Sequence, residues 1–143
     1  MADKYDCLKL DNQLCFPLYS AANKIVRSYT PLLTKLDLTY TQYICMMVLW
    51  EKEKINETEL GERLFLKSNT LAPLLKKLKD KGYIAIKKDK EDGRNIIISL
   101  TDKGLALKDE AVEVPPSIGQ TINLSKEEAE MLYKTLYKYL KEE

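Results

Sequence analysis

The segment NETELGERLFLKSNTLAPLLKKLKDKGYIAIKKDKEDGRNIIISL, residues 56–100, decides the fold. Asn56 is placed to cap a short helix that ends near position 66. After a tight break, Ser68 and Asn69 offer a second cap, and four leucines between positions 71 and 78 form one apolar stripe. Gly82 then ends this helix. The segment therefore predicts two short helices joined by only a few residues.

The hydrophobic period changes from that of a helix to that of a strand after Gly82. β-branched runs at 83–86 and 96–100 flank the charged segment 89–94, which predicts a β-hairpin with a charged tip. Two short helices followed by a hairpin are typical of a winged helix-turn-helix, with the recognition helix near residues 68–81 and the wing near residues 83–100. The expected fold is mainly α with a small β-hairpin wing, in the α+β class.

Further helices are expected on both sides of this module. Helical spacing covers residues 14–36, where Pro31 is expected to bend or restart the helix. Residues 43–50 are apolar nearly all round, which indicates a buried helix. Downstream, Thr101 can cap a helix that stops before Pro115 and Pro116.

The composition of the 143 residues is that of a globular protein, with 45% hydrophobic and 31% charged side chains. No apolar run approaches the roughly 20 residues that cross a bilayer, and no export signal opens the chain. A cytoplasmic protein without a membrane partner is expected. Three cysteines make an odd count, and the absence of histidine removes the commonest zinc ligand and general base. We therefore expect no disulfide framework, no metal, no cofactor and no enzyme.

The net charge of +1 conceals an uneven distribution along the chain. Residues 1–51 carry 5 basic and 5 acidic side chains, residues 52–104 carry 13 and 9, and residues 105–143 carry 5 and 8. The three segments therefore have net charges of 0, +4 and −3. A basic centre between neutral and acidic ends is the pattern expected of a DNA-reading module with separate assembly elements.

The second helix of a helix-turn-helix enters the major groove of double-stranded DNA and presents its N-terminal side chains to base edges. Lysines off the leucine stripe can face phosphates, although exposed lysines on a helix are commonly no more than a solvated surface. Arg94 at the wing tip can enter the minor groove, and Asp92 can orient it or merely form a surface ion pair with it. The predicted DNA-binding residues are Ser68, Asn69, Thr70, Pro73, Lys76, Lys77, Lys90, Asp92 and Arg94.

The first and last helices carry more apolar surface than the central module can cover. The last helix, opened by a capping box at Ser125, places leucines and tyrosines on one side. A homodimer is the simplest way to bury this surface, and its symmetry suits a pseudo-palindromic operator; packing on the same chain alone is the alternative. We expect dimerisation elements over 1–38 and 105–143, and the DNA-binding module over 39–104.

Cys15 stands out as a candidate for redox chemistry. If Asn12 caps the first helix, Cys15 occupies its third position, where free amides and the helix dipole favour the thiolate that reacts with peroxides. A small buried hydrophobe is the plainer interpretation of a lone cysteine. Pro17 can shift the helix start toward Cys15 itself. Cys7 can resolve oxidised Cys15 or be incidental, and Cys45 is expected in the core.

Several motifs resemble those of the MarR family of bacterial regulators, and the resemblance covers nearly the whole chain. They are Ser68 to Lys76, Asp92-Gly93-Arg94 and Leu100-Thr101-Asp102-Lys103-Gly104. Gln13-Leu14-Cys15-Phe16, Leu38-Thr39-Tyr40-Thr41-Gln42-Tyr43 and Leu49-Trp50-Glu51 are similar to the organic hydroperoxide repressor branch of that family.

This resemblance implies a repressor whose reduced dimer binds its operator and releases it when an organic hydroperoxide oxidises Cys15 to a sulfenic acid. It also implies that Tyr19, Tyr29 and Tyr40 surround the cysteine, partly from the partner subunit. Nine tyrosines against two phenylalanines fit such a role for phenol hydroxyls. Because no cysteine follows Cys45, the chain resembles the one-cysteine type.

Other interpretations of the same residues remain open at this point. The trigger can instead be a small aromatic ligand in a tyrosine-lined crevice, or another oxidant such as hypochlorite. A thiol peroxidase that uses Cys15 is more remote, since the chain lacks histidine and an evident resolving pair. A winged helix that binds protein instead of DNA is the third class.

Overall fold

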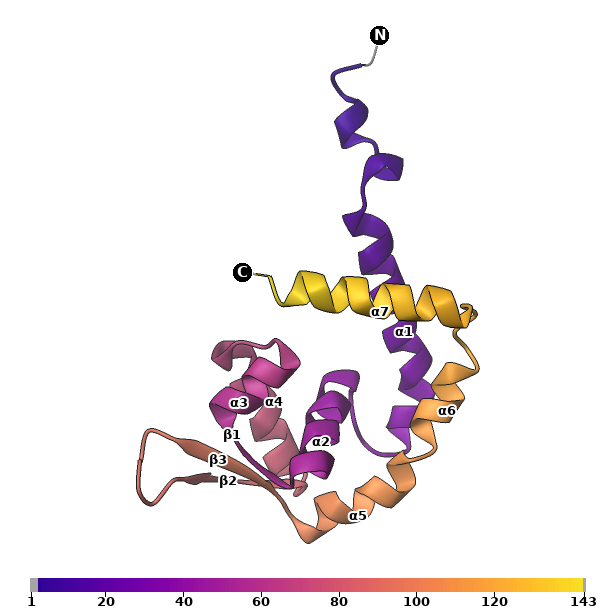
Figure 1. Ribbon diagram of the computed structural model, residues 1–143. Coiled ribbons are helices and arrows are strands. Elements are labelled where there is room, and N and C mark those ends of the chain that lie inside the picture. The colour runs from indigo at the N-terminus through magenta and orange to yellow at the C-terminus, as the bar shows by residue number, and fades with distance from the viewer. Residues whose placement is uncertain (1–2, 143) are drawn as a thin grey trace.

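The computed structural model describes residues 3–142 and has a winged helix-turn-helix at its centre (Figure 1). This confirms the predicted class, mainly α with a small wing. Within the described part of the chain, no helix has the length and apolar character needed to cross a lipid bilayer. The elements are η1 (Asp6–Leu8), η2 (Leu10–Asn12), α1 (Cys15–Thr34), α2 (Tyr40–Lys52), β1 (Lys54–Asn56), α3 (Glu57–Leu64), α4 (Ser68–Asp80), β2 (Ile84–Lys88), β3 (Ile96–Leu100), α5 (Asp102–Ala111), α6 (Val114–Gly119) and α7 (Lys126–Leu140).

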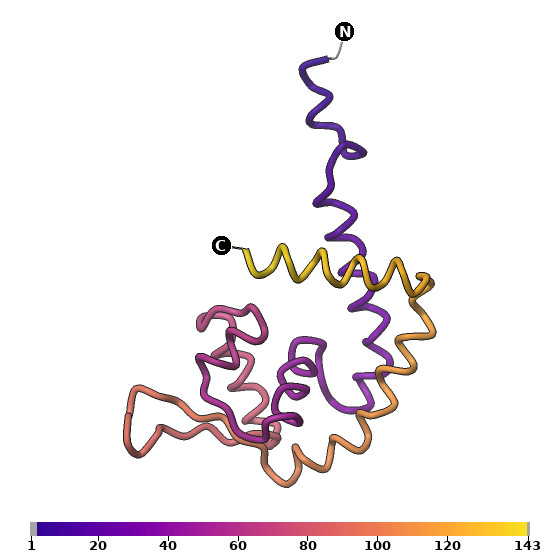
Figure 2. Tube along the Cα trace, viewed as in Figure 1, coloured from indigo at the N-terminus to yellow at the C-terminus, as the bar shows by residue number. Residues whose placement is uncertain are grey.

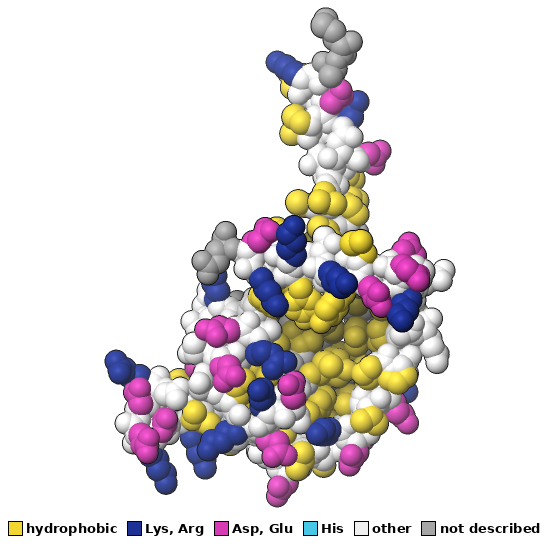
Figure 3. All heavy atoms as spheres, in the orientation of Figure 1, with side chains coloured by type: hydrophobic (Ala, Val, Ile, Leu, Met, Phe, Trp, Pro, Cys, Tyr) yellow, Lys and Arg dark blue, Asp and Glu magenta, His cyan; other side chains and the backbone are white. Residues whose placement is uncertain are grey.

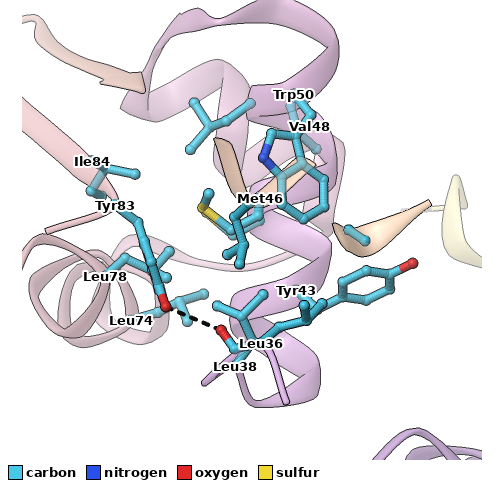
Figure 4. Close-up of a cluster of buried hydrophobic side chains, with 14 of the residues drawn as sticks. Leu36, Leu38, Tyr43, Met46, Val48, Trp50, Leu74, Leu78, Tyr83 and Ile84 are labelled. Atoms are coloured by element: carbon cyan, nitrogen blue, oxygen red, sulfur yellow. Dashed lines mark hydrogen bonds between the residues drawn. The ribbon is translucent and has the colours of Figure 1, made fainter. Parts of the chain in front are cut away.

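The core surrounds α2, which is apolar on nearly every side, as its sequence predicts (Figure 4). Met46 and Leu49 on this helix are fully buried, and Leu78 from α4 and Ile98 from β3 belong to the same buried cluster. Each enclosed aliphatic side chain contributes about 1.5–3 kcal/mol to stability. A capping box at Thr39 fixes the start of α2. The buried side chains of this helix pack in one cluster with those of α4 and β3.

The wing is part of a three-stranded antiparallel sheet in the order β1-β3-β2. Ile86 of β2 and Ile55 of β1 both pair with Ile98 on the central strand. The hairpin formed by β2 and β3 projects away from the helices (Figure 1). Strand β1 was not predicted, because three residues between two helices carry no recognisable strand pattern.

Two expectations about the first helix are wrong. Asn12 lies in η2 and donates its side-chain amide to the Asp6 carbonyl, so it does not cap α1. Cys15 is therefore the first residue of α1, not the third, which agrees with the alternative that Pro17 shifts the helix start. The helix also continues through Pro31 to Thr34 without restarting, and a bend at Pro31 stays a prediction.

One expectation about a later helix start is also wrong. Ser68 is the first residue of α4, and Lys67 occupies the cap position without a side-chain capping bond in the described chain. The prediction for the next helix is confirmed, since Thr101 caps α5 and this helix ends at Ala111, before Pro115 and Pro116. The two prolines lie at the start of α6, which was not predicted. The first amides of a helix have no intrahelical partner, so proline is tolerated there.

The two ends of the chain leave much apolar surface uncovered. The segment before α1 extends away from the body of the molecule (Figure 2), and none of the residues of α7, all of them described, is buried. Figure 3 shows apolar side chains exposed between α7 and the winged module. Large exposed hydrophobic side chains include Leu14, Phe16, Tyr19, Ile25, Met131, Tyr133, Tyr137 and Leu140.

Candidate nucleic-acid interface and thiol site

Helix α4 divides into a buried face and an exposed face, as predicted. Its four leucines are buried against the core, which fixes the rotation of the helix about its axis. Ser68, Asn69, Thr70 and Pro73 are exposed at or near its N-terminal end. The fold therefore presents small and polar side chains where a recognition helix would meet base edges. Contact of these side chains with DNA stays a prediction.

Lysines border this exposed face. Lys76 and Lys77 are exposed, and the Nζ of Lys76 lies 3.7 Å from Asp80 Oδ2 in a pair open to solvent. Such a pair contributes about 0–1 kcal/mol, so the ammonium group is free to exchange it for a phosphate. Three further lysines, which were not predicted, are also exposed beside α4 and on β2: Lys67, Lys87 and Lys88. Basic residues directly before a recognition helix and along a wing were the available signal.

The tip of the wing is ordered by its own acidic side chains. Asp89 accepts from the amide of Glu91 and from the side chain of Asn95. Asp92 Oδ1 accepts from the backbone amide of Arg94 at 3.1 Å and from its Nε at 3.3 Å. The Arg94 side chain is still 95% exposed. Asp92 thus orients a guanidinium that remains available, which combines the two roles considered for this pair.

Cys15 is exposed at the first position of α1, and Tyr19 is exposed one turn later. Tyr29 follows Cys15 by fourteen positions on the same helix. A helix rises about 1.5 Å per residue, so about 21 Å separates these two positions along the axis. A single chain therefore does not bring Cys15 into contact with Tyr29.

Tyr29 and Tyr40 form an aromatic cluster with Tyr43 at the other end of α1. The ring centroids of Tyr29 lie 4.9 Å from Tyr40 and 5.7 Å from Tyr43. Burial, together with the neighbouring Tyr29 and Tyr40 hydroxyls, raises the pKa of Tyr43 to about 12. Burial also raises the pKa of Tyr29 and of Tyr40 above the ordinary value. These phenols therefore remain protonated hydrogen-bond donors at neutral pH.

A groove of about 820 Å³ lies between α2, α3 and α7, beside this cluster. Tyr40 and Tyr137 line it together with Phe65 and Arg63. The ring centroids of Phe65 and Tyr137 are 6.3 Å apart. Sequence patterns selected Tyr40 but not Tyr137, because an aromatic residue in the apolar stripe of an amphipathic helix looks like a core residue.

The other two cysteines differ sharply in their surroundings. Cys45 has no exposed surface, which confirms its predicted place in the core, and burial raises the pKa of its thiol to about 12. Cys7 is exposed, and its Sγ lies 3.5 Å from the carbonyl oxygen of Lys4. Cys7 and Cys15 are thus the accessible thiols of the described chain.

Comparisons with known proteins identify relatives of similar sequence and the same overall fold. A family profile described as "Transcriptional regulator SarA/Rot" matches residues 27–111. The organic hydroperoxide resistance transcriptional regulator of Bacillus subtilis is 42% identical over 140 residues, which cover 98% of this chain and 95% of that protein. The DNA complex of overoxidized AbfR, a protein of Staphylococcus epidermidis, shares 31% identity, covers 97% of this chain and 98% of that one, and gives a TM-score of 0.78.

Two further solved structures extend the comparison. Reduced AbfR bound to DNA is 32% identical, with a TM-score of 0.77 and coverage of 97% of both chains. A mutant of Escherichia coli MarR in complex with operator DNA is 23% identical, covers 97% of this chain and 99% of that one, and gives a TM-score of 0.82. The last similarity concerns the fold alone.

Proposed function

Because the chain belongs to the MarR/SarA family of transcriptional regulators, we propose that it is a DNA-binding repressor that releases its operator when an organic hydroperoxide oxidises Cys15. The observation that carries the proposal is the exposed N-terminal face of α4 beside a projecting wing with Arg94 at its tip. The B. subtilis relative is named for resistance to organic hydroperoxides, which supports the choice of oxidant.

The DNA-reading part of the proposal assigns each exposed group a partner on the duplex. Residues 68–70 and Pro73 meet base edges in the major groove, and Lys76, Lys77 and Lys90 meet phosphates. Arg94, oriented by Asp92, enters the adjacent minor groove. AbfR, a relative at 31–32% identity, is found bound to DNA, which supports the DNA-binding part of the proposal.

The assembly part of the proposal is a homodimer that binds a pseudo-palindromic operator. The uncovered apolar side chains of α1 and α7 support it, since an amphipathic helix must bury its apolar face. A second copy offers the same surface in return, and a two-fold axis presents two α4 helices to successive major grooves.

The dimer also supplies what one chain lacks at Cys15. Tyr29 lies about 21 Å from Cys15 along α1 of the same subunit, and the Tyr40 ring packs against Tyr29, so we propose that Tyr29 of the partner subunit and Tyr40 of the partner subunit complete the site. Tyr19 joins them from the same helix as Cys15. Phenol hydroxyls that keep their protons can donate to the sulfur and orient it toward the entering peroxide.

The proposed chemistry is a two-electron oxidation of the thiolate. Its sulfur attacks the outer peroxide oxygen, the O–O bond breaks, and the departing alkoxide takes a proton from water to become an alcohol. Cys15 is left as a sulfenic acid. A small thiol then condenses with this acid, releasing water and leaving a mixed disulfide.

We assign release of DNA to the bulk of the mixed disulfide and not to the added oxygen alone. Overoxidized AbfR is itself found bound to DNA, which supports this choice. A bulky adduct cannot occupy the space between Cys15 and the phenols, so the two α4 helices change their separation. The distance between the two α4 helices of the dimer would then have two values, one before and one after the mixed disulfide forms.

The test is fluorescence anisotropy with a labelled operator duplex that the wild-type protein selects from a random-sequence library. The reduced protein should bind with a steep salt dependence, and Arg94→Ala should weaken binding without changing thermal stability, because its side chain is 95% exposed. Failure of the wild type to select any DNA would refute the DNA-binding function.

The oxidation part is tested with cumene hydroperoxide in the presence and absence of free cysteine. Release should require both reagents, with intact-mass spectrometry showing a cysteine adduct, and Cys15→Ser should stay on DNA. Cys7→Ser is the matched control and should respond like the wild type. Release of the Cys15→Ser variant by the peroxide would contradict the proposed sensor.

A further inference from the structure

Three turns that are far apart in the sequence meet at one place, which we call the turn junction. It comprises Leu36–Asp37 between α1 and α2, Lys81–Tyr83 between α4 and β2, and Thr101–Gly104 at the start of α5. Thr101 donates its hydroxyl to the Gly82 carbonyl at 2.6 Å and its amide to the Tyr83 carbonyl at 3.1 Å. These bonds close the base of the wing against the end of α4.

Lys81 connects this wing base to the first two helices. Its Nζ donates to the Asp37 carbonyl at 2.6 Å and to Gln42 Oε1 at 2.9 Å, and it lies 3.5 Å from Asp37 Oδ1. Gln42 is only 3% exposed, and the same Oε1 accepts from the Thr39 amide as part of the cap of α2. One ammonium group thus ties the end of α4 to the α1–α2 turn and to the first turn of α2.

A second hydrogen bond joins the same two turns as the bond from Lys81. The Tyr83 hydroxyl donates to the Leu36 carbonyl at 3.1 Å, as the dashed line in Figure 4 shows. Asp37 and Gly82 both have left-handed backbones, with φ of 55° and 85°. The two turns therefore have sharply defined shapes, and Lys81 and Tyr83 join them.

The hydrogen-bonding capacity of Lys81 argues against a direct role on DNA. Of the three donors of the ammonium group, two make hydrogen bonds to the Asp37 carbonyl and Gln42 Oε1, and the charge is paired with the Asp37 carboxylate at 3.5 Å. Only about a quarter of the side chain is exposed, 26%, against 79% for Lys76. Lys81 therefore acts within the protein, whereas Lys76 is available to a phosphate.

We propose that Lys81 is a positioning residue that fixes the recognition helix and wing against the C-terminal end of α1 and transmits the state of that helix to the reading surface. The inference rests on the proposed function, since it concerns how Cys15, at the other end of α1, is coupled to DNA binding. Helix α1 is 20 residues long and continuous, so movement at its first residue reaches the junction through one rigid element.

The experiment compares Lys81→Met with Lys76→Met in the full-length protein, using the selected operator duplex at several salt concentrations. Lys81→Met should lower the affinity of the reduced protein about tenfold with an unchanged salt slope, because no phosphate contact is lost. It should also shrink the ratio of reduced to oxidised affinity. Lys76→Met should lower the salt slope by about 2, one phosphate contact per subunit, and keep that ratio.

Two additional variants and a stability measurement distinguish loss of the Lys81 contacts from unfolding of the protein. Lys81→Arg keeps a donor for the Asp37 carbonyl and should restore most of the affinity and the ratio. Tyr83→Phe removes only the parallel hydroxyl bond and should reproduce part of the Lys81→Met effect. Urea denaturation of every variant checks that the fold is intact.

Either of two results overturns the inference while leaving the proposed function in place. One is a Lys81→Met protein that matches the wild type in affinity and in the reduced-to-oxidised ratio. The other is a salt slope reduced as far as in Lys76→Met, which would make Lys81 a phosphate contact. A wild-type protein that fails to bind DNA refutes the proposed function itself.

Discussion

Replacing Gly104 by alanine is expected to destabilise the protein, although alanine ordinarily stabilises a helix relative to glycine by about 1 kcal/mol. Gly104 lies in the first turn of α5, where it meets the wing base. A Cβ added there would overlap the carbonyl oxygen of Tyr83, and it would lie 3.0 Å from the Tyr83 carbonyl carbon and 3.2 Å from Leu100 Cδ2. Backbone cannot rotate out of the way as a side chain can.

The expected magnitude follows from what holds Gly104 in place. Its amide donates to Thr101 Oγ1 at 3.1 Å, and its carbonyl accepts from Trp50 Nε1 at 2.9 Å. Relieving the overlap costs about 1–3 kcal/mol, and weakening the buried indole bond adds about 1 kcal/mol. After the gain in helix propensity, the net loss is about 2 kcal/mol. The midpoint of thermal unfolding should fall by roughly 6–8 °C.

The assay is urea and thermal denaturation at one fixed chain concentration, since the stability of the proposed dimer would depend on concentration. Gly119→Ala is the matched control, because a Cβ at that helical glycine meets no heavy atom within 4 Å among the described residues. It should be neutral or slightly stabilising. Equal stability of Gly104→Ala and Gly119→Ala would contradict this prediction.

Two further predictions concern titratable groups. Burial raises the pKa of Cys45 to about 12, so iodoacetamide at about pH 8 should leave this thiol unmodified until guanidinium unfolds the chain. Mass spectrometry measures the labelling, and a Cys45 adduct found in the native protein would contradict the prediction. At the start of α7, hydrogen bonds from the backbone and side chain of Ser125 hold the pKa of Glu128 below its ordinary value of 4.5. This stabilisation is present at neutral pH and is lost as pH falls through the lowered pKa, so circular dichroism should show a loss of helix in acid. Glu128→Gln should reduce that loss, because its uncharged side-chain oxygen still accepts the bond from the Ser125 amide.

The recognition helix and the wing were predictable because their signals are local. The leucine stripe and Gly82 delimited α4 to within one residue, since the predicted helix over 68–81 is observed over Ser68–Asp80. The β-branched runs located the two wing strands, with the bounds of β3 as predicted and β2 extending two residues beyond its predicted end, to Lys88. Side chains off the leucine stripe had to be exposed once the leucines were buried, so the candidate DNA-reading face followed from the helix alone.

Features that depend on distant partners were not predictable. Strand β1 exists because Ile55 pairs with Ile98, which lies more than forty positions later. Lys81 looks like one of many surface lysines until folding brings Asp37 and Gln42 to it. A single sequence shows residue types, but it does not show which turns will meet.

The thiol site was also only partly predictable, because its residues are not close together in one chain. Sequence patterns selected Cys15 and its tyrosines, yet one helix places Cys15 and Tyr29 at opposite ends. The start of that helix was also misplaced, because Asn12 bonds the Asp6 carbonyl instead of capping α1. In the proposed dimer, the packing of two chains would decide whether the selected residues meet, and no local pattern of one sequence shows that packing.

If a second copy covers the bare apolar face of α7, as proposed, the fraction of paired chains depends on the concentration of the protein in the cell. A helix with no buried side chain gains little order from the chain that carries it, so its stability depends on whatever covers it. Where the cover is a second copy, dilute chains pair in proportion to the square of their concentration. Halving the supply of chains would then remove about three-quarters of the pairs, and genes under such a regulator would respond steeply to dilution during growth as well as to oxidants.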